Sequence, residues 1–202
     1  MSDAAKTTRP LRIAVIGSGP AGIYASNALA KATIPEGNGD TTFDGVSVDI
    51  FERMPAPFGL IRYGVAPDHP RIKGIIRSLH RVLDQPQIRL FGNVNIGEDV
   101  TLEELKQHYD SVIYATGATK DRDLNLPGAE ATHGGAEFVG FYDANPKFSE
   151  DWKLDAESVA VIGVGNVGLD VARVLAKTGD ELLTTEIPDN VYESLKKNQA
   201  KE

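Results

Sequence analysis

Residues 11–22, LRIAVIGSGPAG, decide how the N-terminal part of this chain folds. The first six of these residues are mostly β-branched or aliphatic, which is typical of a buried strand. A glycine turn of the form GxGxxG follows, and it consists of Gly17, Ser18, Gly19, Pro20, Ala21 and Gly22. Proline suits the first turn of a helix, so the pattern predicts a strand, a tight turn and then a helix.

The glycine spacing favours a dinucleotide phosphate site. In such a turn the first glycine permits the sharp bend, the second lets a pyrophosphate approach the backbone, and the third lets the helix pack close to the sheet. Residues 46–51 (VSVDIF) form the next expected strand, and Glu52 follows it, where a carboxylate can accept hydrogen bonds from ribose hydroxyls. The alternative is a purely structural turn with an acid that caps a strand.

A second GxGxxG occurs late in the chain. Residues 158–163 (SVAVIG) are expected to form a strand, and a helix is expected to run to about residue 177. The turn between them consists of Gly163, Val164, Gly165, Asn166, Val167 and Gly168. Two such turns indicate two dinucleotide sites, or one working site and one decayed duplicate. The residues that would distinguish NAD from NADP should follow a further strand, which this sequence does not contain, so that choice stays open.

The amino-acid composition excludes several kinds of redox and metal site. The chain has 202 residues, 41% of them hydrophobic and 25% charged, which is the balance of a soluble globular protein. It has no cysteine, which excludes a disulfide framework, a thiolate zinc site and a cysteine-ligated iron–sulfur cluster within it. His80, His108 and His133 show no spacing typical of a metal site. Paired dinucleotides without cysteine suggest electron transfer between a flavin and a nicotinamide.

Charge and hydropathy indicate which partners and which cellular location are expected. The net charge of −8 argues against nucleic acid as a partner, and no apolar run approaches the ~20 residues of a membrane span. The N-terminus lacks the apolar core of a signal peptide, so a cytoplasmic location is expected. Residues 53–89 hold seven basic and two acidic residues and include a helix expected to begin at Pro70. This basic stretch either attracts an acidic partner or a phosphate, or is a solvated helix face.

Three further segments carry a family resemblance. Residues 57–70, PFGLIRYGVAPDHP, resemble the signature loop of the adrenodoxin reductase family, which are FAD-containing NADPH:ferredoxin reductases. Ala115, Thr116 and Gly117 resemble the ATG-type turn by which two-dinucleotide flavoproteins leave the FAD domain. Residues 166–173, NVGLDVAR, resemble the start of that family's NADP-binding helix. The resemblance runs from about residue 11 to the C-terminus.

This resemblance implies the fold and its division into domains. An α/β protein is expected, with a Rossmann-like FAD-binding domain over residues 1–117 and a partial Rossmann-like NADP-binding domain over residues 118–202. Such a pair belongs to the glutathione-reductase-like two-dinucleotide-binding superfamily. Because the sequence stops where the second domain should enter its next strand, it is expected to be the N-terminal part of a longer reductase.

The resemblance also implies residue roles. His69 occupies the position of the family's active-site histidine, although it could instead cap the helix that begins at Pro70. FAD contacts are expected from Gly17, Gly19, Pro20, Ala21, Gly22, Glu52, Arg53, Gly59, Leu60, Val94, Ala115, Thr116 and Gly117. NADP contacts are expected from Arg122, Gly163, Val164, Gly165, Asn166, Val167 and Gly168. No metal ligand is expected.

The implied activity is that of a ferredoxin–NADP(+) reductase, in which NADPH passes a hydride to FAD and single electrons then go to a ferredoxin. The full-length enzyme is expected to be a monomer that binds neither nucleic acid nor membrane. Two alternatives remain at this stage. One is another FAD- and NAD(P)H-dependent oxidoreductase, such as a diaphorase or a monooxygenase. The other is a non-catalytic nucleotide-binding module.

Overall fold

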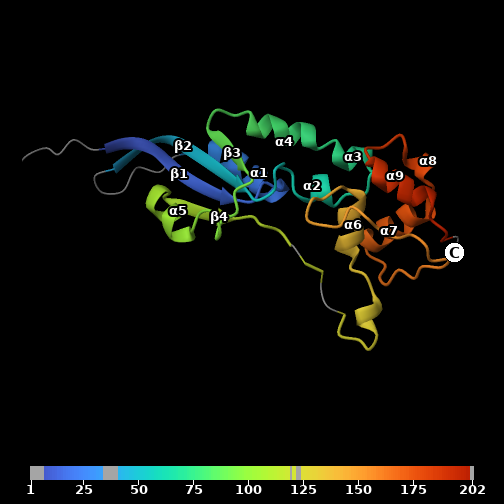
Figure 1. The fold of residues 1–202 in the computed structure, drawn as a ribbon. Coiled ribbons are helices and arrows are strands. Elements are labelled where there is room, and N and C mark those ends of the chain that lie inside the picture. Colours follow the sequence, from blue (N-terminus) through green and yellow to red (C-terminus); the bar gives the residue numbers. More distant parts are fainter. Residues whose placement is uncertain (1–6, 34–40, 119, 122–123, 201–202) are drawn as a thin grey trace, which may run out of the picture. The chain divides into compact units, whose positions relative to one another are not determined.

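The chain divides into two compact units in a computed structural model, which describes residues 7–33, 41–118, 120–121 and 124–200 (Figure 1). The first unit comprises Met1–Gly59 and Ile75–Gly117, and the second comprises Leu60–Gly74 and Ala118–Glu202. Leu60–Gly74 therefore belongs to the second unit, although it precedes the boundary at residue 117 expected from the sequence. The assignment of FAD and NADP to separate domains stays a prediction.

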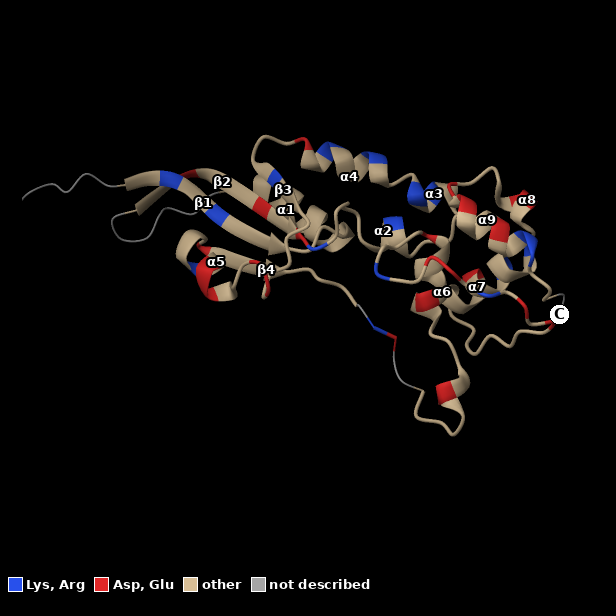
Figure 2. Ribbon diagram, viewed as in Figure 1, with Lys and Arg blue, Asp and Glu red and all other residues tan. Residues whose placement is uncertain are grey.

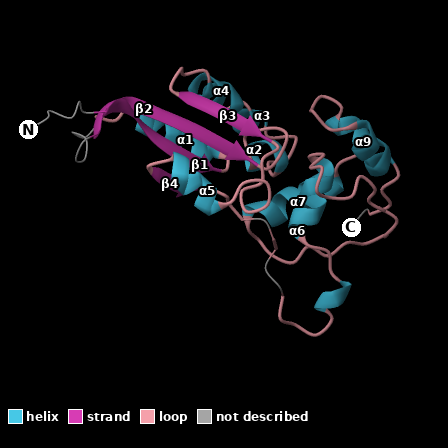
Figure 3. Cartoon of the chain, turned by 60° about the vertical axis from the view of Figure 1, so that its left-hand side comes forward, coloured by secondary structure: helices cyan, strands magenta, loops and turns pink. Residues whose placement is uncertain are grey.

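A four-stranded parallel sheet forms the centre of the first unit, in the order β3-β2-β1-β4 (Figure 3). Its strands are β1 (Thr7–Ile16), β2 (Thr41–Glu52), β3 (Ile88–Gly92) and β4 (Ser111–Tyr114). The predicted first strand lies in the middle of the sheet, where Ala14 and Val15 are completely buried. This strand order is that of the Rossmann fold, so the predicted α/β class is confirmed.

Helices pack against both faces of this sheet. They are α1 (Pro20–Ala30), α4 (Ile76–Leu83) and α5 (Leu102–His108). Leu105 of α5 packs with Ala14, whereas a side chain at Gly22 of α1 would approach Val15. Because successive side chains of a strand point to opposite faces, α1 and α5 cover opposite faces of the sheet.

The helix expected from Pro70 is two helices. Pro70–Lys73 forms α3 and residues from Ile76 form α4, with Gly74 as the C-cap of α3. The division between the two units falls at this break, because Gly74 ends the Leu60–Gly74 segment and Ile75 begins the next part of the first unit. Glycine lowers helix stability by about 1 kcal/mol relative to alanine, so the chain interrupts the helix there at little cost.

The described part of the second unit is helical. It holds α2 (Leu60–Tyr63), α3, a short 3-10 turn η1 (Ala129–Ala131), α6 (Gly135–Tyr142), α7 (Asn166–Ala176), α8 (Gly179–Leu182) and α9 (Asp189–Lys196). Its core contains buried residues of α6, α7, α8 and α9, among them Phe141, Val174 and Leu182. No helix among the described residues of either unit is both long and apolar enough to cross a membrane.

One predicted strand is wrong. Residues 158–163 belong to no sheet, and Ile162 within this segment and Val164 just after it are 68% and 91% exposed. A strand needs a hydrogen-bonded neighbour, and none of the described residues of the second unit pairs with this segment. The apolar sequence of these residues is typical of a buried strand, but none of the described residues pairs with them, so the predicted strand is absent.

Candidate functional site

The first glycine turn is closely packed at Gly17 and Gly22 but leaves its backbone accessible at Gly19. Gly17 has a φ of +104°, and a side chain there would meet the carbonyl oxygen of Ala115. A side chain at Gly22 would meet the carbonyl of Gly17, which explains why α1 can lie so close to β1. At Gly19, in contrast, the nearest atom to an added Cβ is 4.0 Å away. The fold therefore requires the first and third glycines, and the second leaves the backbone accessible at the N-terminus of α1, as a pyrophosphate requires.

Glu52 holds this turn from the end of β2. Its Oε2 accepts hydrogen bonds from the backbone N–H of Ser18 at 2.9 Å and from the Ser18 hydroxyl at 2.7 Å. Its Oε1 accepts from the N–H of Met54 at 2.9 Å and keeps a second lone pair, which a ribose hydroxyl could use. Glu52 is 7% exposed, so these bonds are largely shielded from water. The link to Ser18 was missed from the sequence, since nothing in the motif indicates that the turn contacts the acid.

The start of the signature loop lies against the same turn. The N–H of Phe58 donates to the carbonyl of Ser18 at 3.0 Å, and a side chain at Gly59 would come within 3.0 Å of the Cα of Gly19. Phe58 is fully buried and has a φ of +91°, a conformation that is costly for a residue other than glycine. Its ring packs edge-on against His80, with ring centroids 4.7 Å apart. The first unit thus brings two of the predicted FAD segments into contact.

The remaining predicted FAD residues differ in their surroundings. Ala115 donates its N–H to Ile16 and Val94 donates to Glu52, so both lie at the carboxyl edge of the sheet beside the turn. The others are Pro20 and Ala21 in the first turn of α1, and Arg53, Thr116 and Gly117, which are exposed. Leu60 begins α2 in the second unit and is 61% exposed.

The second glycine turn repeats the local geometry of the first. Gly163 has a φ of +120°, and a side chain at Gly168 would come within 2.8 Å of the Gly163 carbonyl oxygen. Gly165 precedes α7 and has no atom within 4 Å of an added Cβ. The exposed residues Val164, Asn166 and Val167 complete this turn. The predicted NADP residue Arg122 lies outside the described residues.

His69 lies in a polar cluster of the second unit. It is the N-cap residue of α3, but its side chain makes no capping hydrogen bond, so a helix-capping role is not supported. Its Nε2 is instead 2.9 Å from Oδ1 of Asp170 and 2.9 Å from Nη2 of Arg173, both on α7. Nε2 can donate to Asp170 when it carries a proton and can accept from Arg173 when it does not. Both protonation states of this nitrogen therefore have a partner.

Asp68 orients the arginine of this cluster. Its carboxylate accepts from Nε and Nη2 of Arg173, both at 2.7 Å, and from Nζ of Lys177 at 2.6 Å. The hydrogen bond from Arg173, chiefly, holds the pKa of Asp68 well below its usual range, although burial opposes that shift. A bidentate arginine–carboxylate pair is strong and geometrically restrictive. Sequence reasoning missed this pair, although Asp68 lies in residues 57–70 and Arg173 ends residues 166–173, two of the segments that carry the resemblance.

Replacing Glu52 by glutamine tests the support of the first turn. Three hydrogen-bond donors face the two oxygens of the Glu52 carboxylate. In a glutamine side chain only the amide oxygen can accept, because the NH2 group donates. We therefore expect Glu52→Gln to lower the free energy of unfolding by about 1–3 kcal/mol. Urea unfolding would measure this. Glu103→Gln on the exposed face of α5 is the matched control and should change stability by less than about 0.5 kcal/mol. Equal effects of the two variants would contradict the role given to Glu52.

A Rossmann-type parallel sheet, and two glycine turns that share one geometry and each open a helix, define a class: α/β proteins of the two-dinucleotide type. The chain belongs to the pyridine nucleotide-disulphide oxidoreductase family, whose model matches residues 11–202. Within that family, the resemblance to the adrenodoxin reductase family is confirmed by curated relatives. The family name mentions a disulphide, but this chain contains no cysteine.

The relatives are similar over nearly the whole chain. The chain is 45% identical to NADPH-ferredoxin reductase FprA of Mycobacterium tuberculosis over 192 residues, which are 93% of this chain and 41% of the relative. It is 39% identical to the mitochondrial NADPH:adrenodoxin oxidoreductase of Arabidopsis thaliana over 197 residues, 95% of this chain and 38% of the relative. The structure of Mycobacterium tuberculosis FprA in complex with NADPH matches with a TM-score of 0.84 and 44% identity, covering 94% of this chain and 41% of that one.

The chain therefore spans about two fifths of the length of the curated relatives it matches. The common fold is supported by the solved FprA structures, including one of a variant that matches with a TM-score of 0.85.

Proposed function

We propose that this chain carries the dinucleotide-binding machinery of a ferredoxin–NADP(+) reductase, with FAD bound by the first unit and NADP(H) by the second. The observation that carries this proposal is the repeated glycine geometry, in which the middle glycines Gly19 and Gly165 both leave open space at the start of a helix. The names of the relatives, an NADPH-ferredoxin reductase and an NADPH:adrenodoxin oxidoreductase, favour NADP(H) as the nicotinamide nucleotide.

The first unit would hold FAD through groups that are already in place. The backbone at Gly19 and the free N–H groups of the first turn of α1 would bind the pyrophosphate. Glu52 would accept from a ribose hydroxyl with the free lone pair of Oε1. Gly59, Val94 and Ala115 line the same edge of the sheet, so we include them in the FAD site, together with Arg53, Leu60, Thr116 and Gly117 from the family resemblance.

The second unit would hold the nicotinamide nucleotide in the corresponding way. The turn from Gly163 to Gly168 would bind its pyrophosphate at the N-terminus of α7, and Arg122 is proposed as a further contact. Bound FAD supplies the conversion from a two-electron donor to a one-electron donor. His69 would hold or release a proton at Nε2 during that change, with Asp170 and Arg173 as alternating partners.

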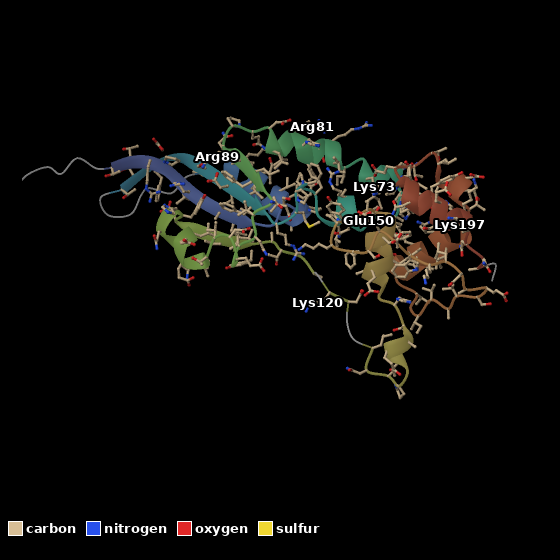
Figure 4. The ribbon with its side chains drawn as sticks, viewed as in Figure 1. Lys73, Arg81, Arg89, Lys120, Glu150 and Lys197 are labelled. Atoms are coloured by element: carbon tan, nitrogen blue, oxygen red, sulfur yellow. The ribbon has the colours of Figure 1, made fainter. Side chains whose placement is uncertain are left out.

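Partner recognition is part of the proposal. Ferredoxin is the proposed electron acceptor, and basic groups would speed its approach if its surface is acidic. In the first unit, α4 carries the exposed residues Arg77 and Arg81 (Figure 2; Arg81 is labelled in Figure 4). Substitutions there should change the association rate and its salt dependence more than the turnover of bound ferredoxin. We also propose a cytoplasmic, monomeric protein.

A flavin experiment tests the proposal. After loading with FAD, the purified protein should keep a visible flavin spectrum through gel filtration, and NADPH added without oxygen should bleach it. NADH at equal concentration is the control and should act more slowly. Subsequent addition of an oxidised ferredoxin should restore the flavin colour. Loss of the flavin on gel filtration and no response to NADPH would contradict the proposal, and bleaching without reoxidation by ferredoxin would favour a diaphorase.

A further inference from the structure

Lys73 is a buried lysine at the C-terminal end of α3 (Figure 4). Its side chain is 9% exposed, and its Nζ is 3.0 Å from Oδ1 of Asp143, whose side chain is 2% exposed. A second carboxylate, that of Glu186, lies 3.2 Å from the same nitrogen and is 65% exposed. Lysine is almost never buried unless it is paired, and Asp143 is the buried partner of Lys73.

The pair lies one helical turn from His69. The backbone N–H groups of Ile72 and Lys73 both donate to the carbonyl of His69 at 3.1 Å. Within the second unit, side-chain contacts therefore hold both ends of α3. At its start the His69 ring meets Asp170 of α7, and at its end Lys73 meets Asp143, the C-cap residue of α6.

The Asp143 carboxylate is buried and only partly hydrogen-bonded. Its Oδ2 is buried and has no hydrogen-bond partner among the described residues. Burial raises the pKa of Asp143 to about 7, and this effect exceeds the opposing attraction of Lys73, while Glu186 raises the pKa further. The other titratable group beside it is Tyr142 on α6, whose buried hydroxyl carries no hydrogen bond among the described residues and whose own pKa burial raises.

We propose that Lys73 and Asp143 form a buried, proton-responsive anchor that positions His69 by fixing the end of α3 against α6. Lys73 and Asp143 are positioning residues, because they act through α3 and do not touch a reacting atom. The anchor itself follows from the contacts in the second unit. Only the consequence for catalysis rests on the proposed function of His69.

The direction of the pH response follows from linkage. When the Leu60–Gly74 segment opens locally, Asp143 reaches water and its pKa returns toward 3.8, whereas in the closed state it stays near 7. The closed state therefore binds the proton more tightly, and opening releases it as pH rises. Between about pH 4 and pH 7 the equilibrium constant for opening should rise by up to about tenfold per pH unit, and above pH 7 it should level off.

Hydrogen–deuterium exchange measures this opening directly. The amides of Ile72, Lys73 and Gly74, followed from pH 5 to pH 9 and corrected for intrinsic exchange, should lose protection up to pH 7 and then remain constant. Asp143→Asn keeps an acceptor for Lys73 but cannot titrate, so its opening constant should be independent of pH. Asp155→Asn, an exposed carboxylate of the same unit, is the control and should behave as the wild type. A pH slope that persists in Asp143→Asn would overturn the anchor.

Removal of the lysine tests the other half of the pair. Above pH 7, where Asp143 is ionised, Lys73→Met should increase the opening constant at least about tenfold, because it leaves the Asp143 carboxylate buried without its cation. Arg71→Met removes the same charge two residues away, from an exposed side chain, and should leave the opening constant unchanged. Equal effects of the two variants would overturn the assignment to Lys73.

The positioning role has its own readout in the flavin-loaded protein. The rate of flavin reduction by NADPH should show a pH inflection near 7 that disappears in Asp143→Asn, whereas a merely structural role would scale the rate equally at every pH. If exchange shows the anchor and the rate profile is unchanged, the positioning of His69 is refuted. If no flavin is reduced at all, the proposed function fails, and the exchange result still decides the anchor.

Discussion

Replacing Gly19 by alanine is expected to release FAD while the first unit stays folded. An alanine Cβ at this position has no neighbour nearer than 4.0 Å, and the residue has an extended conformation with φ −68°, so the protein can accommodate it. The added methyl group would occupy the space where the pyrophosphate approaches the backbone in the proposed FAD site. Loss of even one charge-assisted hydrogen bond costs about 1.5–3 kcal/mol, so affinity for FAD should fall by at least about tenfold.

The second glycine turn offers a matched control for this experiment. Gly165 has no atom within 4 Å of an added Cβ either, and its conformation at φ −77° is also extended. Gly165→Ala should therefore leave FAD binding unchanged and weaken binding of NADP(H), the reverse of the effect of Gly19→Ala. Equilibrium titration with each nucleotide, together with urea unfolding of both variants, measures the pattern. Unchanged FAD affinity in a folded Gly19→Ala variant would remove the first turn from the FAD site.

Replacing Asp68 by asparagine is expected to be the most destabilising of the proposed changes in the second unit. The Asp68 side chain is 11% exposed, and an asparagine would leave Arg173 and Lys177 without their shared carboxylate. Breaking a buried ion pair by removing one partner costs about 3–5 kcal/mol, but Arg173 and Lys177 are about one third exposed and water can solvate them in part. We therefore expect the free energy of unfolding to fall by about 2–3 kcal/mol at pH 7.

The pH dependence of this loss separates it from a packing defect. Because the pKa of Asp68 is lowered in the folded state, its contribution is complete above the ordinary aspartate pKa of 3.8 and is lost as pH falls further. The difference between wild type and Asp68→Asn should thus be constant from pH 7 to pH 5 and narrow below about pH 4. Asp151→Asn, an exposed carboxylate, is the control. A difference that is the same at pH 7 and pH 3 would indicate that charge is not the cause.

The sequence was a good guide where a local pattern carries its own physical reason. The spacing of Gly17, Gly19 and Gly22 predicted the turn between β1 and α1, because Gly17 and Gly22 each meet a steric demand and Gly19 leaves the backbone accessible. Local patterns were a poor guide for residues 158–163, because a strand also depends on a neighbour elsewhere in the chain.

What the sequence by itself determined is the class of protein. Two glycine turns, an acid at the end of a strand and the loop over residues 57–70 are local signals, and they sufficed for the α/β class and the family. Only the tertiary structure decided the partners of the polar side chains: Ser18 with Glu52, His69 with Asp170, and Lys73 with Asp143. These pairs join residues between 34 and 101 positions apart. A local pattern contains no information about contacts that form only when helices and strands pack.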